Sequence, residues 1–167
     1  MRIAYLSLED SRQVGAALGW LELGNPVEAR AELTQLSPRC RNHPEVLRAQ
    51  YLVCEATRDW EGAVEVGHVI CRVFPKSAYG WNQLAYALHQ LRRTDEAYRL
   101  LLPVFPDFPS EAAIPYNLAC YSCQLGNLDE AWEWLNESIA LAGPDEIKTQ
   151  ALADADLEPL RFRILHL

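Results

Sequence analysis

The stretch that decides the fold is "CQLGNLDEAWEWL", residues 123–135, because the chain repeats its pattern three times at a constant spacing. The aligned stretches are "LELGNPVEARAEL" (21–33), "EATRDWEGAVEVG" (55–67) and "HQLRRTDEAYRLL" (89–101). Each begins 34 residues after the one before, and the alignment needs no gap. Self-similarity at a fixed period of this size is typical of repeat proteins.

Each repeat is predicted to be a helical hairpin. Every stretch has a small residue at one position (Ala29, Ala63, Ala97, Ala131) and a turn residue five places earlier (Gly24, Arg58, Arg92, Gly126). Prolines fall between the stretches, where helices should stop. No segment alternates apolar and polar residues as a half-buried strand would. The sequence therefore predicts an all-α fold of about four hairpins.

Local signals refine the hairpins. Asn25 and Thr94 suit the N-cap of the helix that follows, and Pro26 suits its first turn. Pro103 should end the second helix of the third hairpin early, because proline cannot donate within a helix. The segment from Ser7 to Asp10 has the form of a capping box.

The pattern resembles the tetratricopeptide repeat family. The matching residues of the third unit are Trp81, Leu84, Ala85, Leu88, Ala97, Leu101, Val104 and Pro109; those of the fourth are Leu118, Ala119, Gly126, Ala131 and Leu135. The resemblance implies a right-handed α-α superhelical solenoid that forms one domain over residues 1–167. Its repeats would span 10–43, 44–77, 78–111 and 112–145, and residues 146–167 would form a C-terminal cap of one or two helices.

Composition narrows the function. Net charge is −8, which argues against a nucleic-acid partner and against an anionic membrane surface, since both need clustered Lys and Arg. No apolar run is long enough for a signal peptide or a membrane span. The five cysteines are irregularly spaced and fit reduced thiols. These features favour a cytoplasmic protein.

The resemblance places a partner-binding groove on the concave wall made by the first helix of each hairpin. Helical spacing predicts which residues of the second, third and fourth first helices face it: Arg48, Leu52 and Glu55; Tyr79, Asn82, Tyr86 and His89; Tyr116, Cys120 and Cys123. Aromatic side chains supply large contact area at low entropic cost. The alternative is that some of the tyrosines fill space between repeats.

The corresponding stripe of the first helix is aliphatic. Val14, Leu18 and Leu21 would form a contiguous exposed patch, which is unusual unless something covers it. The candidate covers are the chain's own "MRIAYL" segment, a second copy of the chain or a ligand; of these we expect self-cover or a homodimer.

Residues that could carry chemistry are few. No metalloprotease, serine-hydrolase or phosphate-loop motif occurs. Cys120 and Cys123 form a C-x-x-C, but two ligands do not complete a zinc site, and mid-helix thiols lack the activation of a helix N-terminus. We expect no catalytic residue, metal or cofactor.

The sequence favours a non-catalytic module that binds a protein or peptide segment of unknown identity. A small chaperone of the secretion type is an alternative within the binding class. A thiol- or metal-dependent activity at Cys120 and Cys123 is the alternative outside it.

Overall fold

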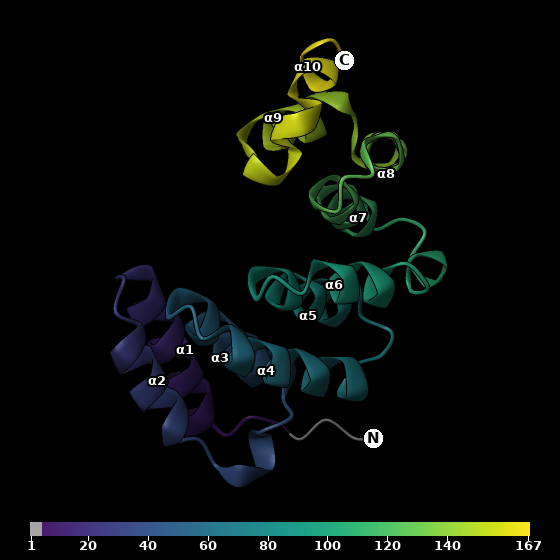
Figure 1. Ribbon diagram of the computed structural model, residues 1–167. Helices are drawn as coiled ribbons and strands as arrows, with labels where there is room; N and C mark the ends of the chain where they lie inside the picture. Colours follow the sequence, from purple (N-terminus) through teal and green to yellow (C-terminus); the bar gives the residue numbers. More distant parts are fainter. Residues whose placement is uncertain (1–4) are drawn as a thin grey trace. The chain divides into compact units, whose positions relative to one another are not determined.

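The computed structural model describes residues 5–167, and these form ten α-helices and three short 3₁₀ helices without a strand (Figure 1). The α-helices are α1 (Leu8–Glu22), α2 (Pro26–Thr34), α3 (Pro44–Ala56), α4 (Trp60–Val73), α5 (Ala78–Gln90), α6 (Thr94–Leu101), α7 (Ala113–Gln124), α8 (Leu128–Ala142), α9 (Pro144–Ala153) and α10 (Arg161–Leu165). The 3₁₀ helices are η1 (Pro38–Cys40), η2 (Phe105–Asp107) and η3 (Ala155–Leu160). The all-α prediction is confirmed.

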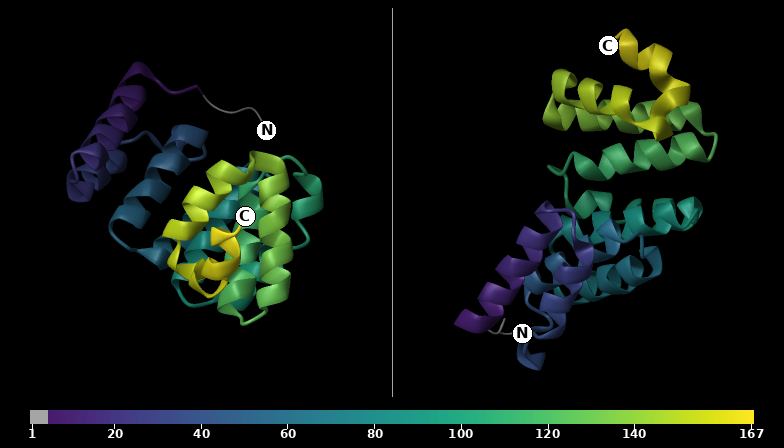
Figure 2. Two further views of the ribbon diagram at one scale, coloured as in Figure 1. Left: turned by 90° about the horizontal axis from the view of Figure 1, so that it is seen from above. Right: turned by 90° about the vertical axis from the view of Figure 1, so that its left-hand side faces the viewer.

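The chain divides into an N-terminal unit, residues 1–80, and a C-terminal unit, residues 81–167. In the N-terminal unit α1 packs on α2, both of these helices pack on α3, and α3 packs on α4. In the C-terminal unit α7 packs on α6 and α8, and α9 packs on α8 (Figure 2). Successive helix hairpins of this kind are the solenoid architecture that the 34-residue period predicts.

The four predicted turns share one backbone conformation. Gly24, Arg58, Arg92 and Gly126 all have positive φ, between 53° and 86°. The amide of the next residue then donates to a carbonyl five residues back, as Asn25 N does to Trp20 O at 2.8 Å and Asn127 N does to Ser122 O at 2.8 Å. This is the Schellman ending of a helix, which satisfies carbonyls that the helix leaves unpaired. Two of the four turns therefore place an arginine where glycine is favoured.

The alanine column is the closest packing position of every hairpin. Ala29, Ala63, Ala97 and Ala131 are each 0% exposed. The partner column twelve residues earlier, Ala17, Tyr51, Ala85 and Ala119, is also 0% exposed. A larger side chain in the alanine column would overpack the contact between the two helices of its hairpin.

Capping follows the sequence at Asn25 and Ser7 and departs from it at Thr94. Asn25 caps α2 by accepting from Glu28 N. Ser7 caps α1 by accepting from Asp10 N, and the Asp10 carboxylate accepts from the Ser7 hydroxyl at 2.6 Å and from the Ser37 amide and hydroxyl, both at 2.9 Å. Thr94 does not cap α6, because Arg93 holds that position and the Thr94 hydroxyl pairs with His89.

Proline and the last residues shape the C-terminal unit. The helix α6 ends at Leu101, two residues before Pro103, as predicted. After α9 the chain breaks at Asp154, forms η3 and closes with α10. Leu157, Leu160 and Ile164 of this closing part are at most 1% exposed.

Candidate partner-binding surfaces

In the N-terminal unit, the predicted stripe of α3 is partly exposed. Arg48 is exposed, and Leu52 and Glu55 are half-buried. Burial raises the pKa of the Glu55 carboxyl. The opposite side of α3, with Val46, Gln50 and Val53, faces α2 and α4. Arg48, Leu52 and Glu55 therefore lie together on the side of α3 that these helices do not cover.

The aliphatic stripe of α1 lies mostly inside the N-terminal unit. Val14 is 2% exposed and packs with Cys40, Val46 and Ala49, and Leu18 and Leu6 pack against this cluster. Leu21 packs against Ala17, Ala29 and Val53. The chain itself thus supplies most of the cover, which removes the argument for a dimer at this patch. Residues 1–4 of the "MRIAYL" segment lie outside the described residues.

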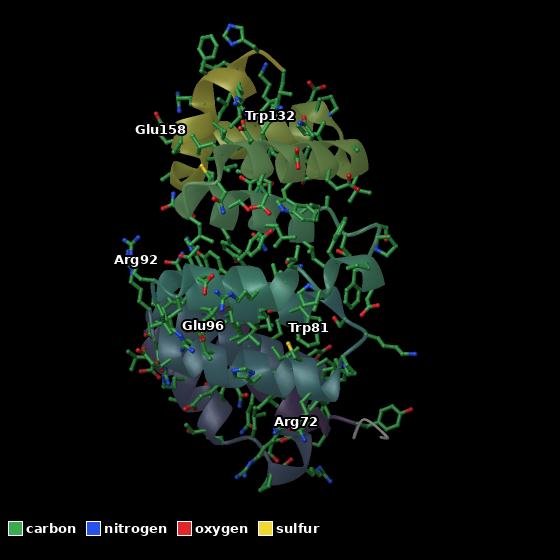
Figure 3. The ribbon with its side chains drawn as sticks, turned by 45° about the vertical axis from the view of Figure 1, so that its right-hand side comes forward. Arg72, Trp81, Arg92, Glu96, Trp132 and Glu158 are labelled. Carbon is green, nitrogen blue, oxygen red and sulfur yellow. The ribbon has the colours of Figure 1, made fainter. Side chains whose placement is uncertain are left out.

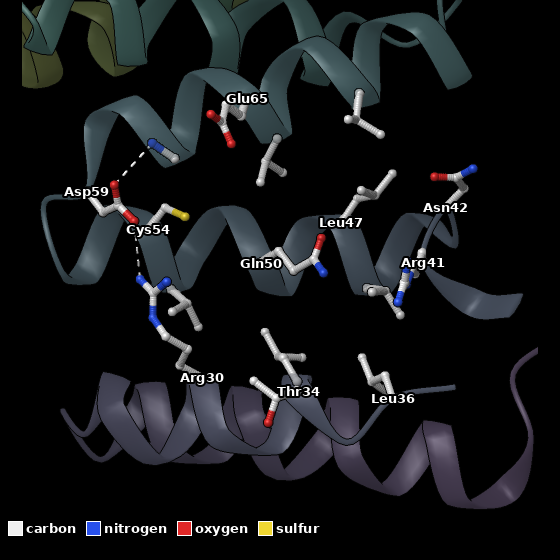
Figure 4. Close-up of a pocket in the computed structure, with 16 residues that line it drawn as sticks. Arg30, Thr34, Leu36, Arg41, Asn42, Leu47, Gln50, Cys54, Asp59 and Glu65 are labelled. Atoms are coloured by element: carbon white, nitrogen blue, oxygen red, sulfur yellow. Dashed lines mark hydrogen bonds and ion pairs between the residues drawn. The ribbon is translucent and has the colours of Figure 1, made fainter. Parts of the chain in front are cut away.

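A groove between α2 and α4 is a feature that helical spacing alone does not predict (Figure 4). Its volume is about 710 Å³, and α3 forms its floor. Leu33, Leu36 and Val66 give it an apolar lining, while Arg41 and Asn42 lie at one end. At the other end Arg30 forms an ion pair with Asp59, with 3.4 Å between Arg30 Nη2 and Asp59 Oδ2.

The predicted tyrosines differ in exposure. Tyr79 is 37% exposed and lines a pocket of about 270 Å³ with Pro44, Leu47, Ile70 and Phe74. Tyr86 is half-buried. Tyr116 is only 5% exposed, so it is part of the interior of the C-terminal unit.

The stripe of α5 and α7 in the C-terminal unit is covered by the chain itself. His89, Cys120 and Cys123 are 4–6% exposed. The segment over them runs from Asp154 to Leu160; it comprises η3 and the residue before it, and we call it the covering segment. Its principal neighbour is α7.

Four side chains of α5 and α7 hold the covering segment. The Tyr116 hydroxyl donates to Asp154 Oδ2 at 3.0 Å, and the Cys120 thiol points at the same oxygen at 3.5 Å. His89 Nε2 lies 2.9 Å from Asp156 Oδ2. Gln124 Nε2 donates to the Asp156 carbonyl at 3.0 Å. Three of these four, His89, Tyr116 and Cys120, are residues that the sequence predicts to face a partner.

The two thiols of the C-x-x-C are held in their neutral form. Burial, followed by the charges of Asp154 and Asp156, raises the pKa of Cys120 well above its ordinary value. The same causes raise the pKa of Cys123 to about 11. A thiolate is the nucleophilic and metal-binding form, so this environment works against both chemistries. Within residues 5–167 no cluster of His, Cys, Asp and Glu has the geometry to hold a metal ion.

Asn82 and Asn117 join α5 to α7. The Asn117 side-chain amide donates to Asn82 Oδ1 at 3.0 Å. Asn82 therefore has a structural partner within the C-terminal unit and is half-buried. In the part of the chain that the structure describes, no helix combines the length and apolar character that crossing a membrane requires.

Comparison with solved structures finds similar helical proteins. PilF of Pseudomonas aeruginosa superimposes with a TM-score of 0.73 at 21% identity, over 95% of this chain and 70% of that one. TTC0263, a thermophilic TPR protein of Thermus thermophilus, gives 0.62 at 18% identity, over 95% and 100%. YrrB, a TPR protein described as having an unusual peptide-binding site, gives 0.62 at 12% identity, over 92% and 89%. No model of a protein family and no curated protein matches the sequence.

Proposed function

Because the chain has the tetratricopeptide repeat fold, we propose that it is a non-catalytic interaction scaffold in which the first helix of a hairpin provides a face that binds a protein or peptide segment. The observation that carries the proposal is the covering segment. The face of α5 and α7 already holds a stretch of polypeptide through four side chains. A surface with this chemistry is suited to holding a segment of another chain.

The partly exposed stripe of α3 is such a face, free to meet a partner. Arg48 makes none of the ion pairs found among the described residues, and it is exposed. Leu52 and Glu55 add an apolar and an acidic contact beside it. The peptide-binding site named for YrrB, a protein of the same fold, supports a similar use here.

A cytoplasmic location is part of the proposal. The five cysteines are all buried and none forms a disulfide. Reduced thiols persist in the reducing cytoplasm and are rare in secreted chains of this size.

Affinity capture with matched charge reversals tests the function. Arg48→Glu on α3 reverses a charge on the proposed face, and Arg72→Glu makes the same change on α4 (Figure 3). We expect proteins captured by the wild-type chain to be lost with Arg48→Glu and kept with Arg72→Glu. Equal capture by both variants would show that the α3 stripe is not the binding surface.

A further inference from the structure

The surface beneath the covering segment consists of hydrogen-bond donors. The Tyr116 hydroxyl, the Cys120 thiol and the Gln124 amide all donate upward to the segment. His89 Nε2 faces a carboxylate oxygen, which can only accept. Its other nitrogen, Nδ1, is 3.0 Å from the Thr94 hydroxyl, and its ring is 5.0 Å from the Tyr121 ring. The imidazole is therefore fixed in orientation before any ligand arrives.

The covering segment presents matching acceptors in a short pattern. Asp154 and Asp156 supply two carboxylates one residue apart, and Asp154 Oδ1 also accepts from Asp156 N at 2.9 Å, which holds the pair in a turn. Leu157 follows directly and is 0% exposed. Two spaced carboxylates and an adjacent leucine are thus what this surface recognises in its own chain.

We propose that the surface of His89, Tyr116, Cys120 and Gln124 is a binding site for an acidic partner segment of the form Asp-x-Asp-Leu, and that the covering segment occupies it as an internal competitor. The inference rests on the proposed function and names its partner class. A partner with the same pattern replaces the covering segment contact for contact. A basic segment offers no carboxylate to the donors of Tyr116, Cys120 and His89.

The C-terminal unit is itself acidic, so its binding of an acidic segment would not depend on overall charge attraction. Residues 81–167 carry 13 acidic and 6 basic side chains, so the unit as a whole repels an acidic segment. The attraction comes from the placement of donors and not from a basic patch. Salt screens the long-range repulsion and acts less on buried hydrogen bonds. Binding should then stay constant or tighten as salt rises, whereas an electrostatically driven complex would weaken.

The test uses a fluorescent peptide with the sequence of residues 153–160, ADADLEPL, and fluorescence anisotropy. The full-length chain with Asp154→Ala, Asp156→Ala and Leu157→Ala opens the site. We expect this opened variant to bind the peptide at least about tenfold more tightly than the wild type, where the internal segment competes. Replacing both aspartates of the peptide by asparagine should weaken its binding at least about tenfold, since hydrogen bonds to charged groups are the stronger ones.

Three controls tie the binding to this surface. Adding Tyr116→Phe to the opened variant removes a donor to the first carboxylate and should reduce the preference for aspartate over asparagine. Adding Gln124→Ala removes a donor to a backbone carbonyl and should weaken both peptides alike. The Glu158→Ala chain removes a charge from the same segment at an exposed position and should bind like the wild type (Figure 3). Should circular dichroism show the opened variant to be unfolded, the Asp154→Ala/Asp156→Ala chain, which keeps Leu157, takes its place.

The outcomes separate the two proposals. Equal affinity for the aspartate and asparagine peptides, no dependence on Tyr116 and Gln124, or no binding to either opened chain would overturn the acidic-segment site. If the acidic-segment site is overturned while the Arg48→Glu chain still fails to capture the proteins, the scaffold function stands without that site. If the peptide binds as expected while Arg48→Glu loses nothing, the site stands and the α3 stripe is excluded.

Discussion

The N-terminal and C-terminal units present the same helix face in two different states. On α3 the stripe is partly exposed, with Arg48 exposed and Leu52 and Glu55 half-buried, whereas on α7 the equivalent stripe is only 4–5% exposed at Tyr116, Cys120 and Cys123. Repeat geometry is the same in both, as the shared turns and alanine columns show. The difference comes from the covering segment, which returns over α7 after α9 ends. A repeat thus supplies a binding face, and the sequence outside the repeats decides whether that face is free.

The largest effect should come from removing the apolar anchor of the covering segment. Leu157→Ala leaves a cavity at a fully buried site and should lower the free energy of unfolding by about 2–5 kcal/mol. Leu52→Ala on the partly exposed stripe of α3 should cost less than about 1 kcal/mol, because its side chain is only half-buried. Urea denaturation followed by circular dichroism measures both. Similar losses would mean that the two faces are covered alike.

Alkaline pH should weaken the C-terminal unit through its buried thiols. The pKa values of Cys120 and Cys123 are raised by folding, so their stabilising contribution is complete below the ordinary thiol pKa of about 8.5 and is lost as pH rises toward their folded values. Between about pH 7 and 10 the wild type should lose on the order of 1–2 kcal/mol through Cys123, since one pKa unit corresponds to about 1.4 kcal/mol, and Cys120 should add to the loss in the same direction.

The pH profile has an internal comparison. Cys120→Ala/Cys123→Ala should flatten the alkaline decline of the urea midpoint. Cys71→Ala, in the N-terminal unit, should reduce the alkaline decline by the contribution of one thiol, because burial raises the pKa of Cys71 to about 11. An unchanged slope in the double variant would show that these thiols are accessible and titrate normally.

The turns should respond equally in both units. Arg58→Gly and Arg92→Gly relieve a positive φ that side chains adopt reluctantly, and each should stabilise the fold by about 0.5–1 kcal/mol (Figure 3). Gly126→Ala imposes the same strain and should destabilise by about 1 kcal/mol. Thermal unfolding of the three variants checks the signs. A gain at only one arginine would mean that the turns differ in strain.

The smallest effect is expected at the exposed edge of the covering segment. Glu158 pairs with Arg161 at 3.2 Å, and both side chains are largely exposed. Glu158→Ala should change stability by less than about 0.5 kcal/mol. A larger loss in urea denaturation would assign this ion pair a role in holding the segment.

The hairpins were predictable because their signals are local. The 34-residue spacing locates the turns, and Pro103 marks the end of α6. Two side-chain contacts were not predicted: the Thr94 hydroxyl pairs with His89 instead of capping α6, and the Asp10 carboxylate accepts from Ser37 as well as from Ser7. Neither contact is visible in a pattern that spans one turn of helix.

The sequence predicted which helix residues form the candidate site, but not the segment that lies over them. Helical spacing selects His89, Tyr116 and Cys120 as neighbours, and the structure brings them together beneath one segment. That Asp154 and Asp156 lie over them depends on how the chain turns after α9, and no periodicity extends that far. The sequence did not predict the α2–α4 groove for a related reason. The groove is a space between helices, and residue spacing describes only one helix at a time.

The most direct test of the account is the reactivity of Cys120 and Cys123 toward an alkylating reagent, followed by peptide mass spectrometry. Asp154→Ala/Asp156→Ala should raise their alkylation rate at least about tenfold over the wild type, because it removes the charged hydrogen bonds that hold the covering segment. Glu158→Ala should leave the rate unchanged. Equal rates in all three chains, or fast alkylation of the wild type, would contradict the claim that the chain covers its own binding face.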